Sequence, residues 1–195
     1  MTYQIAICDD EEKQRAYIKS LVEGWLRQTF HHTKIQEYAS SEQFLFEQAY
    51  DRTQILFLDI EMEKMDGIAL AREIRKHNRQ MQIIFVTGYM EYIQEGYDVE
   101  ALHYLLKPVS QEKIDSVLDR AVERLKTADA VLLVESGGEV LRLPLKEIRF
   151  IESNRNYNII HADNDYEMRG TLSELEEKLD EAFVRVGRSL SLIHI

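Results

Sequence analysis

The sequence predicts an α/β fold: a doubly wound, five-stranded parallel sheet, followed by a smaller, mainly β unit. Over residues 1–125, short apolar runs alternate with amphipathic stretches, as in a parallel sheet wrapped by helices. The runs Ile55–Leu58 and Ile83–Val86 are apolar on both faces, which is typical of central parallel strands. After Leu125 the pattern changes to short strands of alternating polarity. We therefore expect one domain over 1–125, a linker at 126–129 and a second domain over 130–195.

The elements of the first domain follow from the period of the hydrophobic residues. In the first helical stretch, Ile18, Leu21, Val22 and Trp25 recur at helical spacing and share one face. The five predicted strands are Tyr3–Cys8, Lys34–Tyr38, Ile55–Asp59, Gln82–Thr87 and Leu102–Leu106. The five predicted helices are Glu12–Arg27, Ser41–Ala49, Gly67–His77, Tyr92–Tyr97 and Gln111–Leu125.

Serine side chains precede two of these helices and predict where they begin. Ser40 or Ser41 stands ahead of Glu42 and Gln43, and Ser110 stands ahead of the fifth helix. A serine hydroxyl at this position accepts a hydrogen bond from an otherwise unsatisfied backbone N–H of the first turn.

The second domain is predicted to be antiparallel and rich in strands, because short alternating segments are separated by turn residues. Gly137 and Gly138 mark the first turn, and Asp163–Asp165 marks another. We expect a short helix over Leu172–Leu179, before a last strand close to the end of the chain. The predicted strands are Val131–Glu135, Glu139–Pro144, Ile148–Glu152, Tyr157–Ala162 and Phe183–Val186.

Composition excludes several classes of protein. The net charge of −11, shared by both domains, argues against non-specific nucleic-acid binding by the whole surface. The amino terminus carries no basic leader, and no apolar stretch approaches the length of a membrane span, so we expect a cytoplasmic protein without a membrane partner. Cys8 is the only cysteine, which excludes an intramolecular disulfide, and its apolar strand predicts a buried side chain.

Polar residues stand where four of the five predicted parallel strands end: Asp9 and Asp10, Asp59, Thr87, and Lys107. The carboxyl ends of parallel strands meet at one edge of a sheet, so we expect these groups to converge. Converging carboxylates repel one another unless a cation compensates them, and a hard divalent ion such as Mg²⁺ prefers oxygen ligands. The set suits phosphoryl transfer to a carboxylate.

In this chemistry Asp9 and Asp10 are metal ligands, and Asp59 is both a ligand and the nucleophile. Lys107 neutralises the transferred phosphoryl group, and the Thr87 hydroxyl donates a hydrogen bond to it.

Four motifs, spread in order over residues 2–125, resemble the receiver domain of bacterial response regulators, which has a flavodoxin-like fold. They are Ile7–Glu11, Phe57–Met62 with Met65–Gly67, Phe85–Tyr89, and Tyr104–Pro108. The resemblance implies a sensor histidine kinase as the partner that donates phosphate to Asp59. It also implies Mg²⁺ as the cofactor.

The same resemblance assigns roles to further residues. The backbone carbonyl of Glu61 is expected to be an additional metal ligand, Thr87 the switch hydroxyl and Tyr104 the aromatic switch. The Lys107–Pro108 bond is expected to be cis. Gly88 stands where many receivers have alanine, which should leave the phosphate site open.

The second domain resembles the LytTR DNA-binding domain through Ile148–Tyr157, Arg169–Leu175 and Phe183–Ser189. Such domains insert loop side chains into successive major grooves of DNA. The residues that match these loops are Asn154, Arg155, Asn156, Arg188 and Ser189, and Arg and Asn suit bidentate contacts with bases.

The chain departs from the LytTR pattern near its end. Gly187 stands where the family commonly has histidine, and Ser191–Ile195 lacks the expected asparagine-containing continuation. We therefore expect an incomplete LytTR domain whose tail reflects a truncated or shifted reading frame.

The leading hypothesis is a transcription regulator that is controlled by phosphorylation. We expect it not to be an enzyme. We also expect it to form a homodimer when it is phosphorylated. The alternative is a receiver-based signalling module that acts through protein–protein contacts because its output domain is incomplete. A magnesium-dependent phosphatase is the third hypothesis. It fits less well, because the haloacid-dehalogenase pattern places a second aspartate two residues after the nucleophile, where this chain has Glu61.

Overall fold

The computed structural model describes residues 2–29, 32–88, 99–128, 130–136, 139–154, 156–176, 178–179, 183–186 and 190–194. The chain divides into two compact units, Met1–Leu125 and Lys126–Ile195. Each unit has its own hydrophobic core.

The first unit contains the parallel sheet that the sequence predicts, in the strand order β2-β1-β3-β4-β5. Its central strand, β3, is buried along its whole length because the sheet is covered on both faces. The strands are β1 (Thr2–Cys8), β2 (His32–Tyr38), β3 (Ile55–Leu58), β4 (Gln82–Thr87) and β5 (His103–Leu106).

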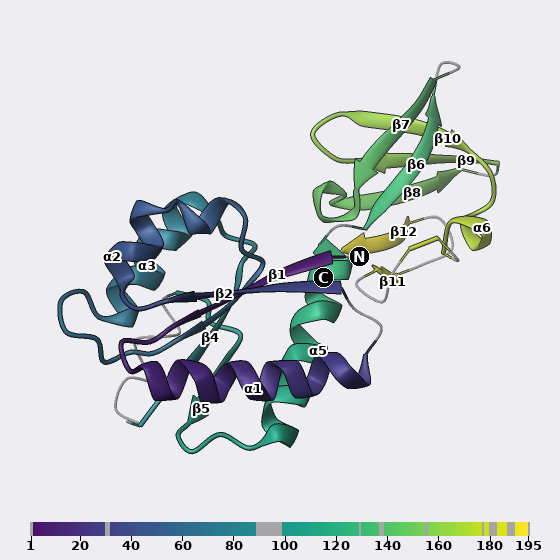
Figure 1. Ribbon diagram of the computed structural model, residues 1–195. Coiled ribbons are helices and arrows are strands. Elements are labelled where there is room, and N and C mark those ends of the chain that lie inside the picture. The colour runs from purple at the N-terminus through teal and green to yellow at the C-terminus, as the bar shows by residue number, and fades with distance from the viewer. Residues whose placement is uncertain are drawn as a thin grey trace. The chain divides into compact units, whose positions relative to one another are not determined.

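Helices cover both faces of this sheet, as Figure 1 shows: α1 and α5 lie on one side, and α2 and α3 on the other. Two apolar cores result, one around Trp25 and the other around Phe85. The fold is therefore doubly wound, as predicted. The helices are α1 (Glu12–Gln28), α2 (Ser41–Phe46), α3 (Gly67–His77) and α5 (Gln111–Ala128).

The second predicted helix is shorter in the structure than the sequence suggests. The second helix ends at Phe46 rather than Ala49, because Gln48 has a left-handed backbone with φ 48°, and a 3₁₀ turn, η1 (Ala49–Asp51), follows. Ser40 is the N-cap of this helix, since its hydroxyl accepts from Gln43 N at 3.2 Å. The predicted fourth helix, Tyr92–Tyr97, lies outside the described residues. Residues 126–128, predicted to be a linker, are the last residues of α5.

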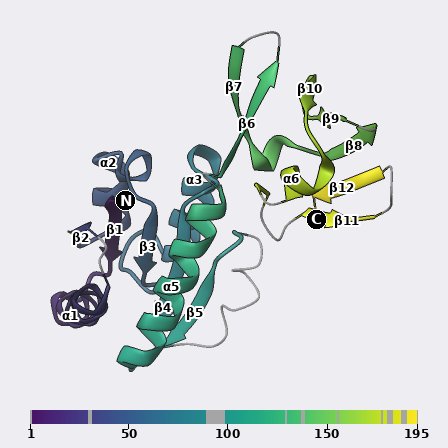
Figure 2. The same ribbon diagram turned by 90° about the vertical axis from the view of Figure 1, so that its right-hand side faces the viewer.

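The second unit is mainly β, as predicted, and Figure 2 shows its hairpin and sheet strands. A hairpin of β6 and β7 is followed by the 3₁₀ turn η2 (Leu145–Glu147) and a five-stranded sheet in the order β10-β9-β8-β12-β11, with α6 (Leu172–Glu176) between β10 and β11. The strands are β6 (Val131–Ser136), β7 (Glu139–Pro144), β8 (Phe150–Asn154), β9 (Tyr157–His161), β10 (Asp165–Arg169), β11 (Phe183–Arg185) and β12 (Leu190–His194).

Two strands of this sheet were not predicted. Asp165, assigned to a turn, is the first residue of β10, which pairs with β9 from Asp165↔His161 to Arg169↔Tyr157. Phe183–Val186 is not the last strand, because β12 follows it and lies between β8 and β11. β12 pairs with the distant β8, which local sequence patterns do not reveal, whereas β10 forms a hairpin with the neighbouring β9.

Among the described residues, no helix has both the length and the apolar character that a membrane span requires.

Candidate phosphorylation site and DNA-binding residues

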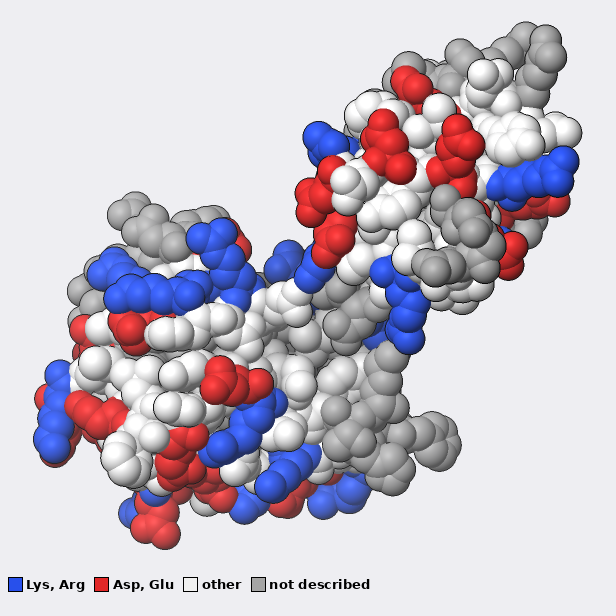
Figure 3. All heavy atoms as spheres, turned by 90° about the horizontal axis from the view of Figure 1, so that it is seen from above, with Lys and Arg blue, Asp and Glu red and all other residues white. Residues whose placement is uncertain are grey.

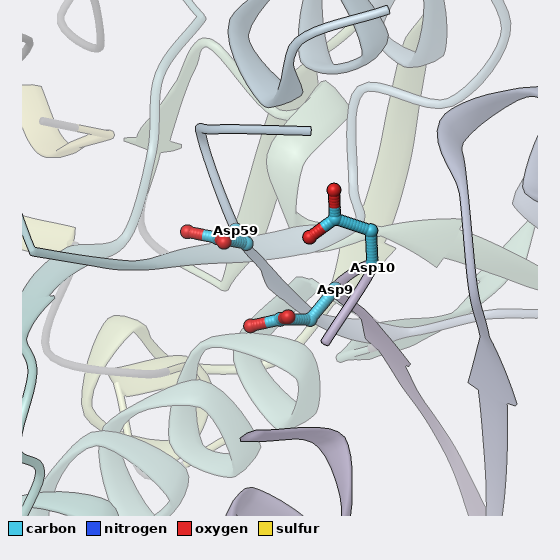
Figure 4. Close-up of side chains that lie close together, drawn as sticks. All are labelled: Asp9, Asp10 and Asp59. Carbon is cyan, nitrogen blue, oxygen red and sulfur yellow. The ribbon is translucent and has the colours of Figure 1, made fainter. Parts of the chain in front are cut away.

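Three carboxylates meet at the carboxyl edge of the parallel sheet. Asp9 follows β1 directly, Asp10 is the next residue, and Asp59 follows β3. Each contributes one oxygen to a group whose members all lie within 4.8 Å of one another. In Figure 4 the three side chains lie together beside the ends of their strands. The structure thus brings together the three carboxylate side chains that were predicted to bind a metal.

Lys107, which follows β5, reaches two of these carboxylates. Its Nζ lies 2.9 Å from Asp9 Oδ2 and 3.0 Å from Asp59 Oδ2, and its backbone N–H donates to Thr87 O at 2.9 Å. The Lys107–Pro108 bond is cis, as predicted. The ammonium group therefore holds Asp9 and Asp59 as a bridged pair.

Asp59 lies in a buried position, with 5% of the residue exposed. Burial raises the pKa of its carboxyl to about 6, the Lys107 ammonium opposes this rise, and the charge of Asp9 adds to it. Asp59 Oδ1 accepts a hydrogen bond from Ile60 N at 2.9 Å, and Oδ2 faces Lys107. Both oxygens of the carboxyl group are thus positioned before any ligand binds.

Asp9 is held by several hydrogen bonds, one of them from Arg15, whose role was not predicted from the sequence. Its Oδ1 accepts from Glu11 N at 2.8 Å, and its backbone carbonyl accepts from Arg15 Nη1 at 2.6 Å. Arg15 lies in the first turn of α1, where the helix dipole disfavours a cation. The contact with the Asp9 carbonyl offsets this unfavourable position of Arg15.

Gly67 allows α3 to begin against the backbone of Asp59. A Cβ at Gly67 would lie 2.0 Å from the carbonyl oxygen of Asp59, and Gly67 N donates to Ile60 O at 2.8 Å. Asp66 caps the helix by accepting from Ala69 N at 2.7 Å. The close approach fixes the loop that carries Asp59, and only glycine fits there.

The two predicted switch residues occupy neighbouring strands. Thr87 is the last residue of β4 and is buried. Tyr104, in β5, stacks on Phe85 of β4, with ring centroids 4.9 Å apart and planes at 28°. Thr87 lies at the same sheet edge as Asp59, because β4 pairs with β3 in parallel.

The donor set fits a hard divalent cation. Three ionised carboxylates and one ammonium group leave two negative charges, which such an ion balances with oxygen ligands. Asp10 is the most exposed of the three carboxylates, and beside it lies a hollow of about 380 Å³ lined also by Glu61, Met62 and Asp66. The hollow gives solvent access to the edge of the cluster.

Cys8, which precedes the cluster, is a buried side chain, as predicted, with no exposed surface. Burial, and next the charge of Asp9, raise the pKa of its thiol to about 12. Its Sγ lies 3.9 Å from Met62 Sδ. The thiol is therefore protonated and packed as a small apolar group.

The predicted DNA-binding residues are only partly described by the structure. Asn154 is the last residue of β8, and Asn156 lies in the turn before β9; both are exposed. Arg155, Arg188 and Ser189 lie outside the described residues. Asn154 and Asn156 border a hollow of about 600 Å³ that Tyr157, Ile159 and Glu167 also line.

Comparison with known protein families matches both units. The family model of the response regulator receiver domain matches residues 5–119, and that of the LytTr DNA-binding domain matches residues 138–193. The sensory transduction protein LytT of Bacillus subtilis is 29% identical over 95% of this chain and 80% of its own length. The accessory gene regulator protein A of Staphylococcus epidermidis is 31% identical over 95% of this chain and 84% of its own length.

Solved structures resemble the first unit. The receiver domain of AraT, a response regulator from Geobacillus stearothermophilus, is 28% identical with a TM-score of 0.56, and the match covers 65% of this chain and 97% of that domain. The receiver model spans more than half of the chain, and the second model accounts for most of the remainder. The chain therefore belongs to the two-component response regulators in which a receiver domain is followed by a LytTR DNA-binding domain.

Proposed function

We propose that Asp59 accepts a phosphoryl group from a sensor histidine kinase in the cytoplasm and that this phosphorylation controls transcription through the LytTR unit. The observation that carries the proposal is the convergence of Asp9, Asp10 and Asp59 within 4.8 Å, with Lys107 bridging two of them. Phosphoryl transfer needs this combination of an aligned nucleophile and concentrated positive charge.

In the proposed reaction, an Asp59 carboxylate oxygen attacks the phosphorus of the donor. The bond from phosphorus to the donor atom breaks, the donor leaves with that electron pair, and an acyl phosphate remains on Asp59. Lys107 is close enough to exchange its contact with Asp59 Oδ2 for one with the new phosphoryl group. The hydrogen bond from Ile60 N keeps Asp59 Oδ1 in place during this change.

Asp9, Asp10, Asp59 and the backbone carbonyl of Glu61 would hold Mg²⁺. When bound, the ion supplies positive charge that offsets the carboxylates and the incoming phosphate oxygens. The remaining contribution comes from the protein, since Arg15 and Glu11 N hold Asp9, and Gly67 lets α3 fix the Asp59 loop.

Thr87 and Tyr104 would transmit phosphorylation to the surface of the receiver. We propose that the Thr87 hydroxyl turns to the phosphoryl group and that Tyr104 moves with it, changing the surface near β5. Two receivers then associate through that face as a homodimer.

The LytTR unit would bind DNA through the loops that carry Asn154, Arg155 and Asn156 and, further along the chain, Arg188 and Ser189. The exposed side chains of Asn154 and Asn156 support this role, since base contacts require side chains that are accessible in the free protein.

The test is the intact mass of the protein after treatment with a small-molecule phosphodonor, with and without Mg²⁺, beside the Asp59→Asn variant. We expect one added phosphoryl group that requires both Mg²⁺ and Asp59. Equal phosphorylation of Asp59→Asn, or no phosphorylation of folded wild-type protein, would refute the proposal. Light scattering tests whether phosphorylation produces the homodimer. Equal masses for the phosphorylated and the unphosphorylated protein would contradict it.

A further inference from the structure

A second hollow of the receiver lies between β5 and α5, away from the carboxylate cluster. Its volume is about 260 Å³, and its lining includes three basic side chains: His103 of β5 and Lys113 and Arg120 of α5. All three are exposed to solvent. The proposed phosphorylation chemistry uses none of them.

Within the part of the chain that the structure describes, these basic groups have no acidic partner. No ion pair joins His103, Lys113 or Arg120 to a carboxylate anywhere in the described ranges of the chain. The pKa of His103 is lowered, first by partial burial and then by the charges of Arg120 and Lys113. Like charges therefore accumulate on one hollow of a chain whose net charge is −11, and an anion would relieve their repulsion.

The rest of the lining suits a small molecule. The buried side chains of Leu105 and Val117 supply apolar surface, and Ser116 supplies a hydroxyl. Glu112 is the one carboxylate among the described lining residues, which the basic groups outnumber. A water molecule occupies about 30 Å³ of liquid, so the hollow of about 260 Å³ has room for roughly nine waters or for one phosphate or carboxylate group with a few attached carbons.

We propose that this hollow is a binding site for a small anionic molecule, whose phosphate or carboxylate group is held by Lys113, Arg120 and His103. Lys and Arg hold such groups by charge-assisted hydrogen bonds, which are stronger than neutral ones. The apolar surface of Leu105 and Val117 contacts the carbon skeleton of the ligand.

Tyr104 also lines the hollow. If Tyr104 moves on phosphorylation, which rests on the proposed function, the anion and the phosphoryl group share one two-state element. Phosphorylation then changes the affinity for the anion, and the bound anion biases the same two-state equilibrium.

The experiment is calorimetric titration of the full chain with inorganic phosphate and, separately, with citrate, at fixed ionic strength and without Mg²⁺. Wild-type and Asp59→Asn proteins are both titrated, so that binding is measured independently of phosphorylation. We expect saturable binding of at least one of the two anions. The double variant Lys113→Gln/Arg120→Gln should bind that anion about tenfold or more weakly, because it loses two charge-assisted contacts.

The matched control is Lys34→Gln/Arg79→Gln, which removes the same charge from two other exposed positions of the receiver. It should bind like the wild type, and Trp25 fluorescence on urea unfolding verifies that both double variants fold. Equal weakening in the two double variants, or no saturable binding of either anion, would overturn the proposal.

Discussion

The phosphorylation site of the receiver and the β8–β9 turn of the LytTR unit present polar side chains in opposite ways. Asp9 and Asp59 are buried, and their carboxylates accept hydrogen bonds from Glu11 N, Ile60 N and Lys107 Nζ. Asn154 and Asn156 are exposed, and their side chains make no hydrogen bond with the rest of the described chain. Burial forces polar groups to find partners, so the side chains of the receiver site are held in place by the protein itself, whereas those of the turn are left to solvent.

The largest test of this contrast is Lys107→Ala. The substitution leaves Asp9 and Asp59 buried without their shared cation, and we expect a loss of about 3–5 kcal/mol in the free energy of unfolding of the receiver at pH 7 without Mg²⁺. Urea unfolding followed by Trp25 fluorescence measures it, since the chain's only tryptophan lies in the receiver core. Lys126→Ala, an exposed lysine, is the control. A loss no greater than in this control contradicts a buried, bridged pair.

The titration of Asp59 should make the free energy of unfolding depend on pH. Without metal, the pKa of Asp59 is about 6 in the folded protein, above its ordinary value of 3.8. The folded state therefore binds this proton more tightly, and the resulting stability is fully present below pH 3.8 and lost as the pH rises through about 6. We expect the unfolding free energy of the wild type to fall by roughly 2–3 kcal/mol relative to Asp59→Asn over this window.

Chemical denaturation of both proteins at several pH values between 4 and 7 measures this difference. Parallel curves for wild type and Asp59→Asn would show that Asp59 titrates at its ordinary pKa and is not a buried carboxyl.

Two glycines of the receiver provide a smaller effect. Gly67→Ala places a Cβ 2.0 Å from the Asp59 carbonyl oxygen, so backbone must move, and we expect a loss of about 1–3 kcal/mol or more together with slower phosphorylation. A Cβ at Gly88 meets no atom within 4 Å in the described structure. Gly88→Ala is therefore the matched control, and thermal unfolding of the two variants should differ clearly. Similar melting temperatures would mean that α3 does not abut Asp59.

The smallest expected effects lie in the LytTR unit, where two asparagines of one sequence stretch differ in burial. Asn158 is fully buried and its Nδ2 donates to Gly170 O at 2.9 Å, so Asn158→Ala should cost about 1–3 kcal/mol. Asn156→Ala should change stability by less than about 0.5 kcal/mol, because Asn156 is exposed.

Amide hydrogen exchange of peptides covering β8–β10, read by mass spectrometry, measures the effect within this unit. Faster exchange in Asn156→Ala than in Asn158→Ala would mean that Asn156, and not Asn158, stabilises this sheet.

The sequence predicted the receiver more completely than the LytTR unit for physical reasons. The central strands β3 and β4 are nearly continuous apolar runs, and polar residues stand where four of the five parallel strands end. Asp9, Asp59, Thr87 and Lys107 could therefore be predicted from the sequence to meet at one edge of the sheet. Strand β10 consists mainly of polar residues, so the predicted turn extended into its first residue, Asp165. Strand β12 lies between β11 and the distant β8, and this pairing has no local sequence pattern.

Helix caps such as Ser40 were predicted, but two other contacts between a side chain and a backbone carbonyl were not. Arg15 contacts the Asp9 carbonyl, and Asn158 contacts the Gly170 carbonyl, and neither acceptor has a sequence signature. Arg15 in the first turn of α1 was the more detectable of the two, because a cation there opposes the helix dipole.

The buried, protonated thiol of Cys8 has a practical consequence for measuring movement in this protein. Alkylating reagents attack thiolates, and the only native cysteine has no exposed surface and a pKa of about 12. A cysteine introduced at an exposed position of either unit would consequently be the single site of labelling in the folded chain. Spin labels or fluorophores could be attached in this way without first removing the native cysteine.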